Sequence, residues 1–202
     1  MLKLVLETTL PETLIALYNT ETDELWEQRD AQPRASERLH SHIDTLLQHA
    51  NATLSDVGHI VVTCGPGSFT GIRVGLAVAQ AMDLAESTPS TTLTTLQALA
   101  LSHPSDNNTT VVMDSLGQEV FVQTFDKNNN PLDEAQCLLQ EEAMKYLADK
   151  TNFIGNGLKK LDIPTTKHLV NARTLAQLSD TSQELRPFYL KPLNYRKMTP
   201  AA

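Results

Sequence analysis

A chain of 202 residues, of which 41% are hydrophobic, is long enough for one or two compact units with a buried core. Its formal net charge of −8 argues against strong direct binding to nucleic acid, because phosphate contacts require clustered lysine and arginine. With only two cysteines, no apolar run long enough for a membrane span and no signal-peptide pattern after Met1, the sequence predicts a cytoplasmic protein that does not enter a membrane.

The apolar pattern in the first half of the chain predicts strands and helices in alternation. Strands are expected at 2–6, 13–18, 24–29, 60–62 and 91–95, and helices at 36–50 and 72–86. A stretch rich in turn-forming residues follows at 102–108, and we place a domain boundary there. The expected units are residues 1–102 and residues 103–202.

The second half begins with the same residue pattern as the first. An apolar strand ends in an acid and a hydroxyl at Glu7-Thr8 and again at Asp114-Ser115. A further strand is expected after each turn, at 13–18 and at 119–125. The repeated strand, acidic turn and strand indicate an internal duplication.

A glycine-rich segment joins the strand at 60–62 to the helix that follows it. We call it the glycine loop; it consists of Gly65, Pro66, Gly67, Ser68, Phe69, Thr70 and Gly71. Loops of this kind often hold phosphate, because backbone N–H groups and a helix N-terminus converge there. The sequence excludes a Walker loop, since no lysine lies between Lys3 and Lys127, and it lacks the glycine spacing of a dinucleotide fingerprint or of a hydrolase elbow. We expect a structural loop in which Ser68 or Thr70 caps the helix.

Residues suited to catalysis or to metal binding are sparse. His40 and His42 are two apart and point to different sides of a helix, and no cysteine and histidine spacing fits zinc. Cys64 beside the glycine loop is expected to be a small core residue rather than a nucleophile. We therefore expect no catalytic residue, no metal and no cofactor.

The run from Gly65 to Gly75, GPGSFTGIRVG, resembles the motif of the bacterial TsaB (YeaZ) family, which is related to the glycoproteases. Weaker similarities lie at 35–39, 113–121 and 187–191, so the resemblance extends over nearly the whole chain. The chain departs from the family at Leu116, which replaces an arginine, and at Glu7, where the family usually has aspartate.

The resemblance implies an α/β, actin/hexokinase-like (ASKHA) fold with two subdomains related by a duplication. In members of that fold that bind nucleotides, the two acidic turns contact the nucleotide phosphates and a metal. Here the first turn has no glycine, and Pro11 removes a donor N–H, so the turn would hold a nucleotide poorly. We expect Glu7, Thr8 and Asp114 to make ordinary turn hydrogen bonds.

The resemblance also implies a function. A TsaB protein is a non-catalytic subunit of the machinery that makes threonylcarbamoyladenosine (t6A) on tRNA. It pairs with its catalytic paralogue TsaD and with the ATPase TsaE, and tRNA is reached only through the complex.

The helix expected at 72–86 has more apolar circumference than one sheet contact can cover. Its cover is either the preceding helix or another chain. The candidate partner-binding residues are Arg73, Val74, Ala77, Val78 and Ala81 on this helix and Leu39 and Ile43 on the preceding one.

Two other classes of function stay open at this point. The chain is alternatively a self-sufficient actin-like phosphotransferase or peptidase, or a homodimeric scaffold. The basic residues of the tail, Arg186, Lys191, Arg196 and Lys197, alternate with aromatic residues and suit contact with RNA or a partner, although a C-terminal strand and a solvated tail are the default interpretation.

Overall fold

The computed structural model of the protein describes residues 1–179 and 184–191. The basic and aromatic residues Tyr195, Arg196 and Lys197 of the tail lie outside the described residues. None of the described helices combines the length and the apolarity needed to cross a membrane.

The first half of the chain forms a five-stranded sheet in the order β3-β2-β1-β4-β5. Its strands are β1 (Leu2–Glu7), β2 (Thr13–Asn19), β3 (Leu25–Asp30), β4 (Val57–Thr63) and β5 (Ser90–Leu93). The hairpins β1–β2 and β2–β3 are antiparallel, whereas β4 is parallel to β1 and β5 is parallel to β4. Strands β1, β2 and β4 are buried along nearly their whole length, as expected of strands covered on both faces.

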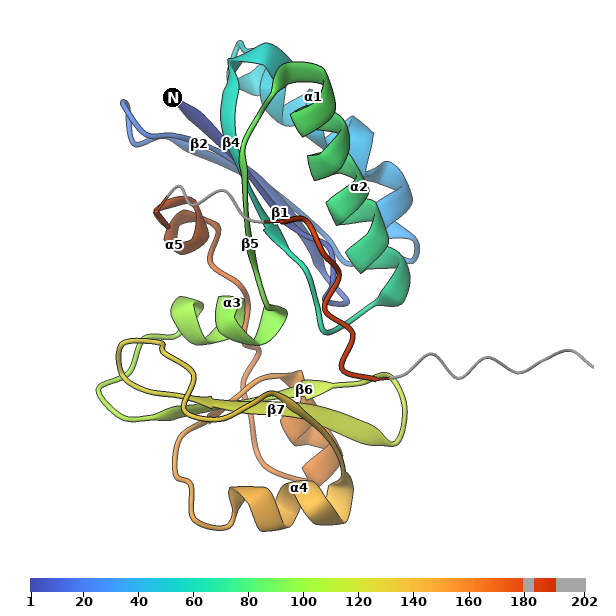
Figure 1. The fold of residues 1–202 in the computed structure, drawn as a ribbon, viewed down its shortest axis with the longest axis vertical. Coiled ribbons are helices and arrows are strands. Elements are labelled where there is room, and N and C mark those ends of the chain that lie inside the picture. Colours follow the sequence, from blue (N-terminus) through green and yellow to red (C-terminus); the bar gives the residue numbers. More distant parts are fainter. Residues whose placement is uncertain (180–183, 192–202) are drawn as a thin grey trace, which may run out of the picture.

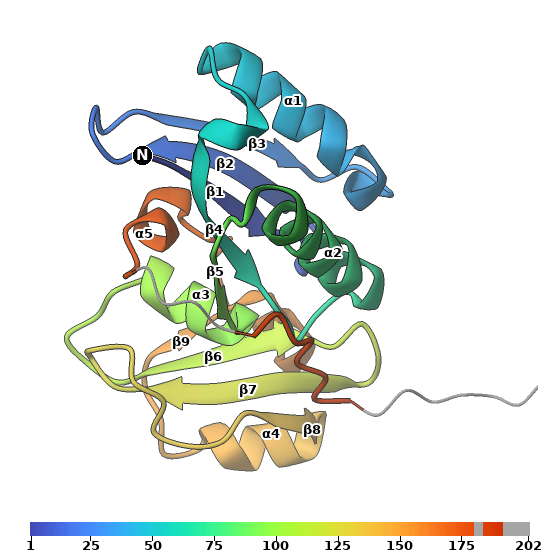
Figure 2. The same cartoon turned by 45° about the horizontal axis from the view of Figure 1, so that its top comes forward.

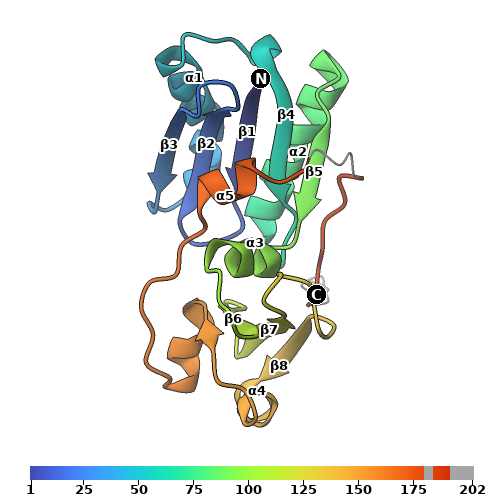
Figure 3. The same ribbon diagram turned by 90° about the vertical axis from the view of Figure 1, so that its left-hand side faces the viewer.

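Two helices cover one face of this sheet (Figures 1 and 3). Helix α1 (Leu39–His49) follows a 3-10 turn (Ala35–Arg38), and helix α2 (Phe69–Glu86) follows the glycine loop. Leu39, Ile43, Leu46 and Leu47 of α1 are buried in one cluster with the apolar side of α2 and with β1, β2 and β4. A second 3-10 turn (Leu54–Asp56) leads into β4.

The second half forms a four-stranded sheet in the order β8-β7-β6-β9. Its strands are β6 (Thr109–Asp114), β7 (Glu119–Phe125), β8 (Gln136–Leu139) and β9 (Phe153–Ile154). Helix α4 (Gln140–Leu147) and a 3-10 helix (Asn156–Leu161) pack on the outer face of this sheet.

The two sheets repeat one topology. In each, an antiparallel hairpin (β1–β2, β6–β7) is extended by the next strand on one side and by a parallel strand (β4, β9) on the other. The acidic turn occupies the same place in both hairpins. The duplicated α/β plan expected of an actin/hexokinase-like fold is confirmed.

Helices α3 (Thr95–Ser102) and α5 (Ala172–Ala176) lie between the two sheets (Figure 3). Helix α3 packs on β6 and β7, whereas α5 returns to pack on β1 and β2. Their buried residues join both sheets in one central core. Packing therefore crosses residue 102 in both directions, and the proposed boundary between 102 and 103 remains a prediction.

The segment 184–191, which we call the strap, runs past the glycine loop to the second sheet (Figure 2). The Phe188 backbone N–H donates to the Cys64 carbonyl at 2.8 Å. At the other end, Lys191 Nζ donates to Glu119 Oε2 at 2.6 Å. The strap thus ties the end of β4 to the beginning of β7.

Candidate functional site

The acidic turns of both halves and the glycine loop meet at one cleft. The cavity there measures about 490 Å³ and is lined by Thr8 and Thr9 of the first turn, Gly67 and Ser68 of the loop, and Asp114 of the second turn, among others. This is the place where the resemblance puts phosphate and metal, so the state of these groups decides what the cleft can do.

The carboxylate of Glu7 is used by its own turn. Its Oε1 accepts hydrogen bonds from the Thr9 backbone N–H at 2.6 Å, the Thr9 hydroxyl at 2.7 Å and the Leu10 backbone N–H at 2.9 Å. Burial raises the pKa of Glu7, and hydrogen bonds from Thr9, Thr63 and Leu10 offset part of that rise. The expectation of turn hydrogen bonding at Glu7 is confirmed.

The glycine loop is packed against the first acidic turn. The Thr8 hydroxyl donates to the Gly71 carbonyl at 2.7 Å, and the Ser68 backbone N–H donates to the Thr9 carbonyl at 2.8 Å. A Cβ atom added at Gly67 or at Gly71 would overlap the carbonyl oxygen of Thr9 or of Thr8. The space that these glycines leave is therefore occupied by protein backbone and is not open for a phosphate.

Local contacts around the loop are structural. Ser68 Oγ accepts from the Gly71 backbone N–H at 3.2 Å and caps α2, as expected. Cys64 Sγ donates to the Leu93 carbonyl at 3.3 Å, and burial raises the pKa of this thiol to about 11. A thiol so rarely ionised is a core residue rather than a nucleophile.

The acid of the second turn, Asp114, is paired with a lysine from a distant part of the chain. Asp114 Oδ1 accepts from the Leu116 backbone N–H at 2.6 Å and forms an ion pair with Lys160. The same ammonium donates to the Gly117 carbonyl at 2.7 Å. Lys160 therefore neutralises the Asp114 carboxylate at the place where the resemblance puts metal and phosphate.

The candidate metal ligands stay apart. His42 Nε2 lies 3.0 Å from Asp30 Oδ2, whereas His40 is exposed. Within residues 1–179 and 184–191, no group of three or more His, Cys, Asp and Glu side chains has a metal-binding arrangement.

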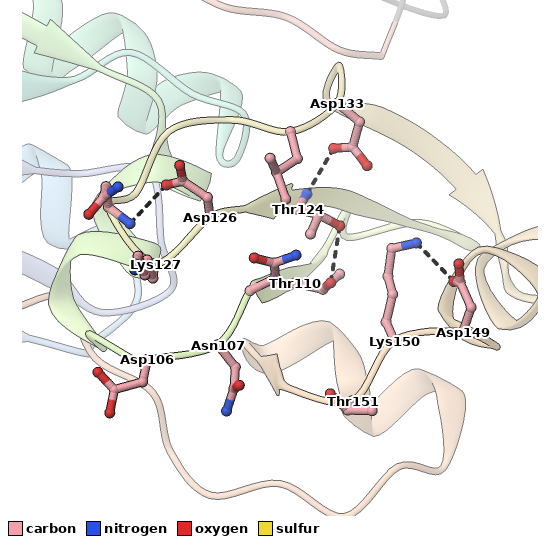
Figure 4. A pocket seen from close by; sticks show the side chains of 13 residues that line it. Asp106, Asn107, Thr110, Thr124, Asp126, Lys127, Asp133, Asp149, Lys150 and Thr151 are labelled. Carbon is pink, nitrogen blue, oxygen red and sulfur yellow. Dashed lines mark hydrogen bonds and ion pairs between the residues drawn. The ribbon is translucent and has the colours of Figure 1, made fainter.

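A larger hollow of about 660 Å³ lies by the β7–β8 connection and the loops that precede β6 and β9 (Figure 4). It is polar, and three of its four acids, Asp126, Asp133 and Asp149, are bonded to neighbours. Asp133 accepts from the Thr124 backbone N–H at 2.9 Å and from the Tyr146 hydroxyl at 2.5 Å, and Lys150 donates to Asp149 at 3.1 Å. These groups hold the local turns together, so we do not place the functional site there.

The structure separates the candidate partner-binding residues into two groups. Arg73, Ala77 and Ala81 are exposed on α2, and Val74 is half-buried. In contrast, Val78, Leu39 and Ile43 belong to the buried core between the first sheet and its two helices: Val78 is 8% exposed, Leu39 0% and Ile43 4%. We therefore withdraw these last three as candidate partner-binding residues, because the two helices and the sheet already cover them.

Two further surface features lie on or beside α2. Leu84 is 90% exposed, and its spacing from Ala77 and Ala81 places it on the same side of α2. The Arg73 guanidinium lies 3.8 Å from the centre of the Phe69 ring and beside the Tyr189 hydroxyl of the strap. The helical spacing signalled Leu84, but no local pattern signalled the contact with the strap.

Comparisons with known proteins agree with this geometry. A family model described as TsaD, tRNA N6-adenosine threonylcarbamoyltransferase, matches residues 28–167, which is more than half of the chain. The chain belongs to this family.

Within the family, this TsaD-family chain is similar to proteins named tRNA threonylcarbamoyladenosine biosynthesis protein TsaB. The protein from Buchnera aphidicola is 30% identical over 130 residues, which are 59% of this chain and 61% of that protein. The protein from Escherichia coli is 26% identical over 132 residues, 60% of this chain and 57% of that protein. The chain therefore matches about three fifths of the length of these relatives. The protein from Haemophilus influenzae is 29% identical over 192 residues, 80% of this chain and 81% of that protein.

A solved structure shows the same fold. YeaZ from Pseudomonas aeruginosa superimposes with a TM-score of 0.76 at 21% identity, and the match covers 94% of this chain and 99% of that chain. The resemblance of this TsaD-family chain to the TsaB (YeaZ) group, first indicated by residues 65–75, is confirmed.

Proposed function

We propose that the chain is a non-catalytic subunit of the machinery that makes threonylcarbamoyladenosine on tRNA. It works in the cytoplasm and pairs with a catalytic TsaD paralogue and with the ATPase TsaE. The names of the TsaB relatives support the pathway, and the contacts in the cleft support the accessory role.

One observation supports the accessory role: the two acidic turns and the glycine loop, which form the cleft, already make contacts within the chain. The Glu7 carboxylate accepts from its own turn, Lys160 neutralises Asp114, and the backbone of Thr8 and Thr9 fills the space at the glycines. Binding a nucleotide phosphate and its metal here would require breaking several of these contacts. The chemistry in this proposal belongs to the TsaD paralogue.

The proposed docking face is the exposed side of α2, formed by Arg73, Val74, Ala77, Ala81 and Leu84. Its alanines let another helix approach closely, and Leu84 offers a large apolar side chain to a partner. Exposed apolar side chains that lie along one helix face support a protein contact more than an RNA contact. The net charge of −8 agrees with tRNA being held by another subunit.

The same face would also serve a homodimer, which is the second candidate. A second copy presents the same self-complementary surface, as a twofold interface requires. The two candidates compete for one surface if both use α2. A heterodimer with the TsaD paralogue should then form at the expense of the homodimer.

Reconstitution tests the proposal. The TsaD and TsaE paralogues, supplied with tRNA and the substrates of the reaction, should form threonylcarbamoyladenosine efficiently only when this chain is added. The chain alone should neither hydrolyse ATP nor modify tRNA. Robust ATP turnover by the chain alone would instead support the self-sufficient phosphotransferase.

A further inference from the structure

Two histidines meet where the end of α3 contacts the segment that leads from the second half of the chain back to the first. His103 follows the last residue of α3, and His168 lies in residues 162–171, which we call the crossing segment. This segment connects the 3-10 helix at 156–161 to α5 (Figure 3). The two imidazole rings pack edge to face with their centres 5.0 Å apart. Neither histidine has a part in the proposed function.

The contacts of His168 require a neutral ring. The Gly155 backbone N–H donates to His168 Nδ1 at 3.2 Å. A backbone N–H can only donate, so this ring nitrogen carries no proton and the proton of the neutral ring is on Nε2. The Thr165 hydroxyl lies 3.3 Å from the same nitrogen and donates to the Thr166 carbonyl at 3.0 Å. Protonation of Nδ1 would therefore break the hydrogen bond from Gly155.

The surroundings of His103 also favour a neutral ring. Its Nε2 is buried and has no hydrogen-bond partner among the described residues, so a proton there would be a buried donor without an acceptor. Burial lowers the pKa of His103, and a hydrogen bond to the backbone of Leu169 offsets part of that effect. Burial, followed by the charge of His103, lowers the pKa of His168. Geometry and burial thus agree that both rings are neutral in the folded chain.

The charged groups nearby do not stabilise a positive charge on either ring. Within residues 1–179 and 184–191, no carboxylate is paired with His103 or His168. Helix α3 carries no charged residue, and the nearest acid that follows it in the sequence is the exposed Asp106. His168 lines a cavity of about 290 Å³, which the following charged residues also line: Glu7, Glu12, Arg29, Lys159 and Lys167. The cations of this cavity outnumber its acids, and its two acids already accept from groups of the chain.

Further contacts connect the same place to the second acidic turn. The Asn171 backbone N–H of the crossing segment donates to Ser102 Oγ at the end of α3, at 2.8 Å. Gly155 precedes Asn156, whose Oδ1 accepts from the Asp114 backbone N–H at 3.0 Å. The histidine pair therefore lies between α3, which belongs to the central core, and the 3-10 helix that supports the second acidic turn.

We propose that His103 and His168 form an acid-sensitive latch between the two halves of the fold. While both rings are neutral, the latch holds the crossing segment against the end of α3 and against Gly155. In mild acid the rings take up protons, the hydrogen bond from Gly155 breaks, and two positive rings repel each other at close range. The crossing segment then separates from α3, and the junction between the halves loosens.

The direction of the pH dependence follows from the neutral folded state. The pKa of each ring is below the ordinary histidine value of about 6.5, so the released segment binds protons more readily than the closed latch does. The contribution of the latch to stability is complete above about pH 6.5 and is lost as the pH falls below that value.

Hydrogen exchange at the backbone amides of Gly155 and Asn171 measures the latch in the full chain. Their protection factors, which are corrected for the intrinsic pH dependence of exchange, should fall by about tenfold or more between about pH 7.5 and about pH 5.5. His168→Asn can keep an acceptor near the position of Nδ1 but cannot titrate, so it should remove most of the fall at Gly155. His40→Asn, an exposed change on α1, is the matched control and should show the same fall as wild type.

Two measurements keep the test decisive if His168→Asn does not fold. His103→Phe keeps an aromatic ring without its charge and should reduce the fall at Asn171. In wild type, NMR titration of the imidazole C–H signals should show that both rings take up protons at a lower pH than free imidazole does.

Four results would overturn the proposal. The first is equal protection of Gly155 and Asn171 at the two pH values in wild type. The second is an undiminished fall in folded His168→Asn or His103→Phe, and the third is loss of the fall in His40→Asn, because either would assign the pH dependence to other groups. The fourth is protonation of both rings at or above the pH at which free imidazole is protonated.

Discussion

Thr8 and Gly71 fix the glycine loop to the first acidic turn. The Thr8 hydroxyl donates to the Gly71 carbonyl at 2.7 Å, and the Thr8 carbonyl oxygen lies where a Cβ of residue 71 would be. A glycine is therefore required at 71 by close packing rather than by a bound phosphate. This contact explains how a loop with the composition of a phosphate loop serves as a structural joint.

The first prediction follows from that contact. Gly71→Ala should lower the free energy of unfolding by about 1–3 kcal/mol, because the added methyl group must push the backbone of Thr8 away. Gly58→Ala is the matched control, since its Cβ would crowd the flexible, exposed side chain of Met1 and meet the Leu2 carbonyl only at ordinary contact distance, and it should change stability by less than about 1 kcal/mol. Urea denaturation of both variants measures the difference, and equal stability would contradict the packing role of Gly71.

The second prediction separates the core side of α2 from its exposed side. Val78→Glu should destabilise the chain by about 3 kcal/mol or more, because it buries an unpaired charge in the core. Ala81→Arg, three residues further on an exposed position, should change the free energy of unfolding by about 0.5 kcal/mol or less. Thermal melts followed by circular dichroism compare the two, and a native-like melt for Val78→Glu would show that Val78 is not a core residue.

Most strands and helices of the first half could be predicted from the sequence. The expected strands at 2–6 and 13–18 correspond to β1 and β2, and the helix expected at 72–86 corresponds to α2, which begins three residues earlier at Phe69, after its Ser68 cap. These elements have long, strongly apolar patterns, and the two acidic turns repeat clearly enough to reveal the duplication. The expectation of a single helix at 36–50 was less exact, because its first turn is a 3-10 helix that ends at Arg38.

The rest depends on contacts between distant parts of the chain. Helices α3 and α5 are short and were not predicted, and their position between the sheets is decided by the central core rather than by local pattern. Likewise, the residues next to Asp114 and Lys160 in the sequence do not predict their ion pair, which joins positions 46 apart. The burial of Val78 depends on the sheet and the helix around it. The sequence therefore predicted an apolar helix face but not which of its residues remain at the surface.

The third prediction concerns acid stability. Hydrogen bonds from His42 and from the Gln32 backbone N–H, together with the Arg38 guanidinium, lower the pKa of Asp30 to about 2. A folded-state pKa below the unfolded value of about 4 means that this carboxylate stabilises the fold above pH 4 and loses that effect as the pH falls toward 2. Denaturation at several pH values should show that wild type loses more stability than Asp30→Asn between pH 4 and pH 2. Parallel losses in the two proteins would contradict this role of Asp30.

The fourth prediction tests the ion pair between Lys160 and Asp114 in the second acidic turn. Lys160→Met should lower the free energy of unfolding by about 1–2 kcal/mol, because it leaves the partly buried Asp114 and the Gly117 carbonyl without their ammonium donor. Adding Asp114→Asn should cost less in this background than in wild type, since the carboxylate has already lost its partner. A double-mutant cycle in urea measures the coupling, and strictly additive effects would show that the pair contributes nothing to stability.

The central claim is that the exposed side of α2 docks the TsaD paralogue, and size-exclusion chromatography of the two purified proteins tests it most directly. Wild type should elute with the paralogue as a complex. Ala81→Arg and Leu84→Glu should elute separately from it although each is folded by circular dichroism, because a charge inserted into an apolar contact is costly only when a partner buries it. An exposed change away from α2, Glu21→Gln, should leave the complex intact. Intact complexes with both α2 variants would contradict the claim and place the partner on another surface.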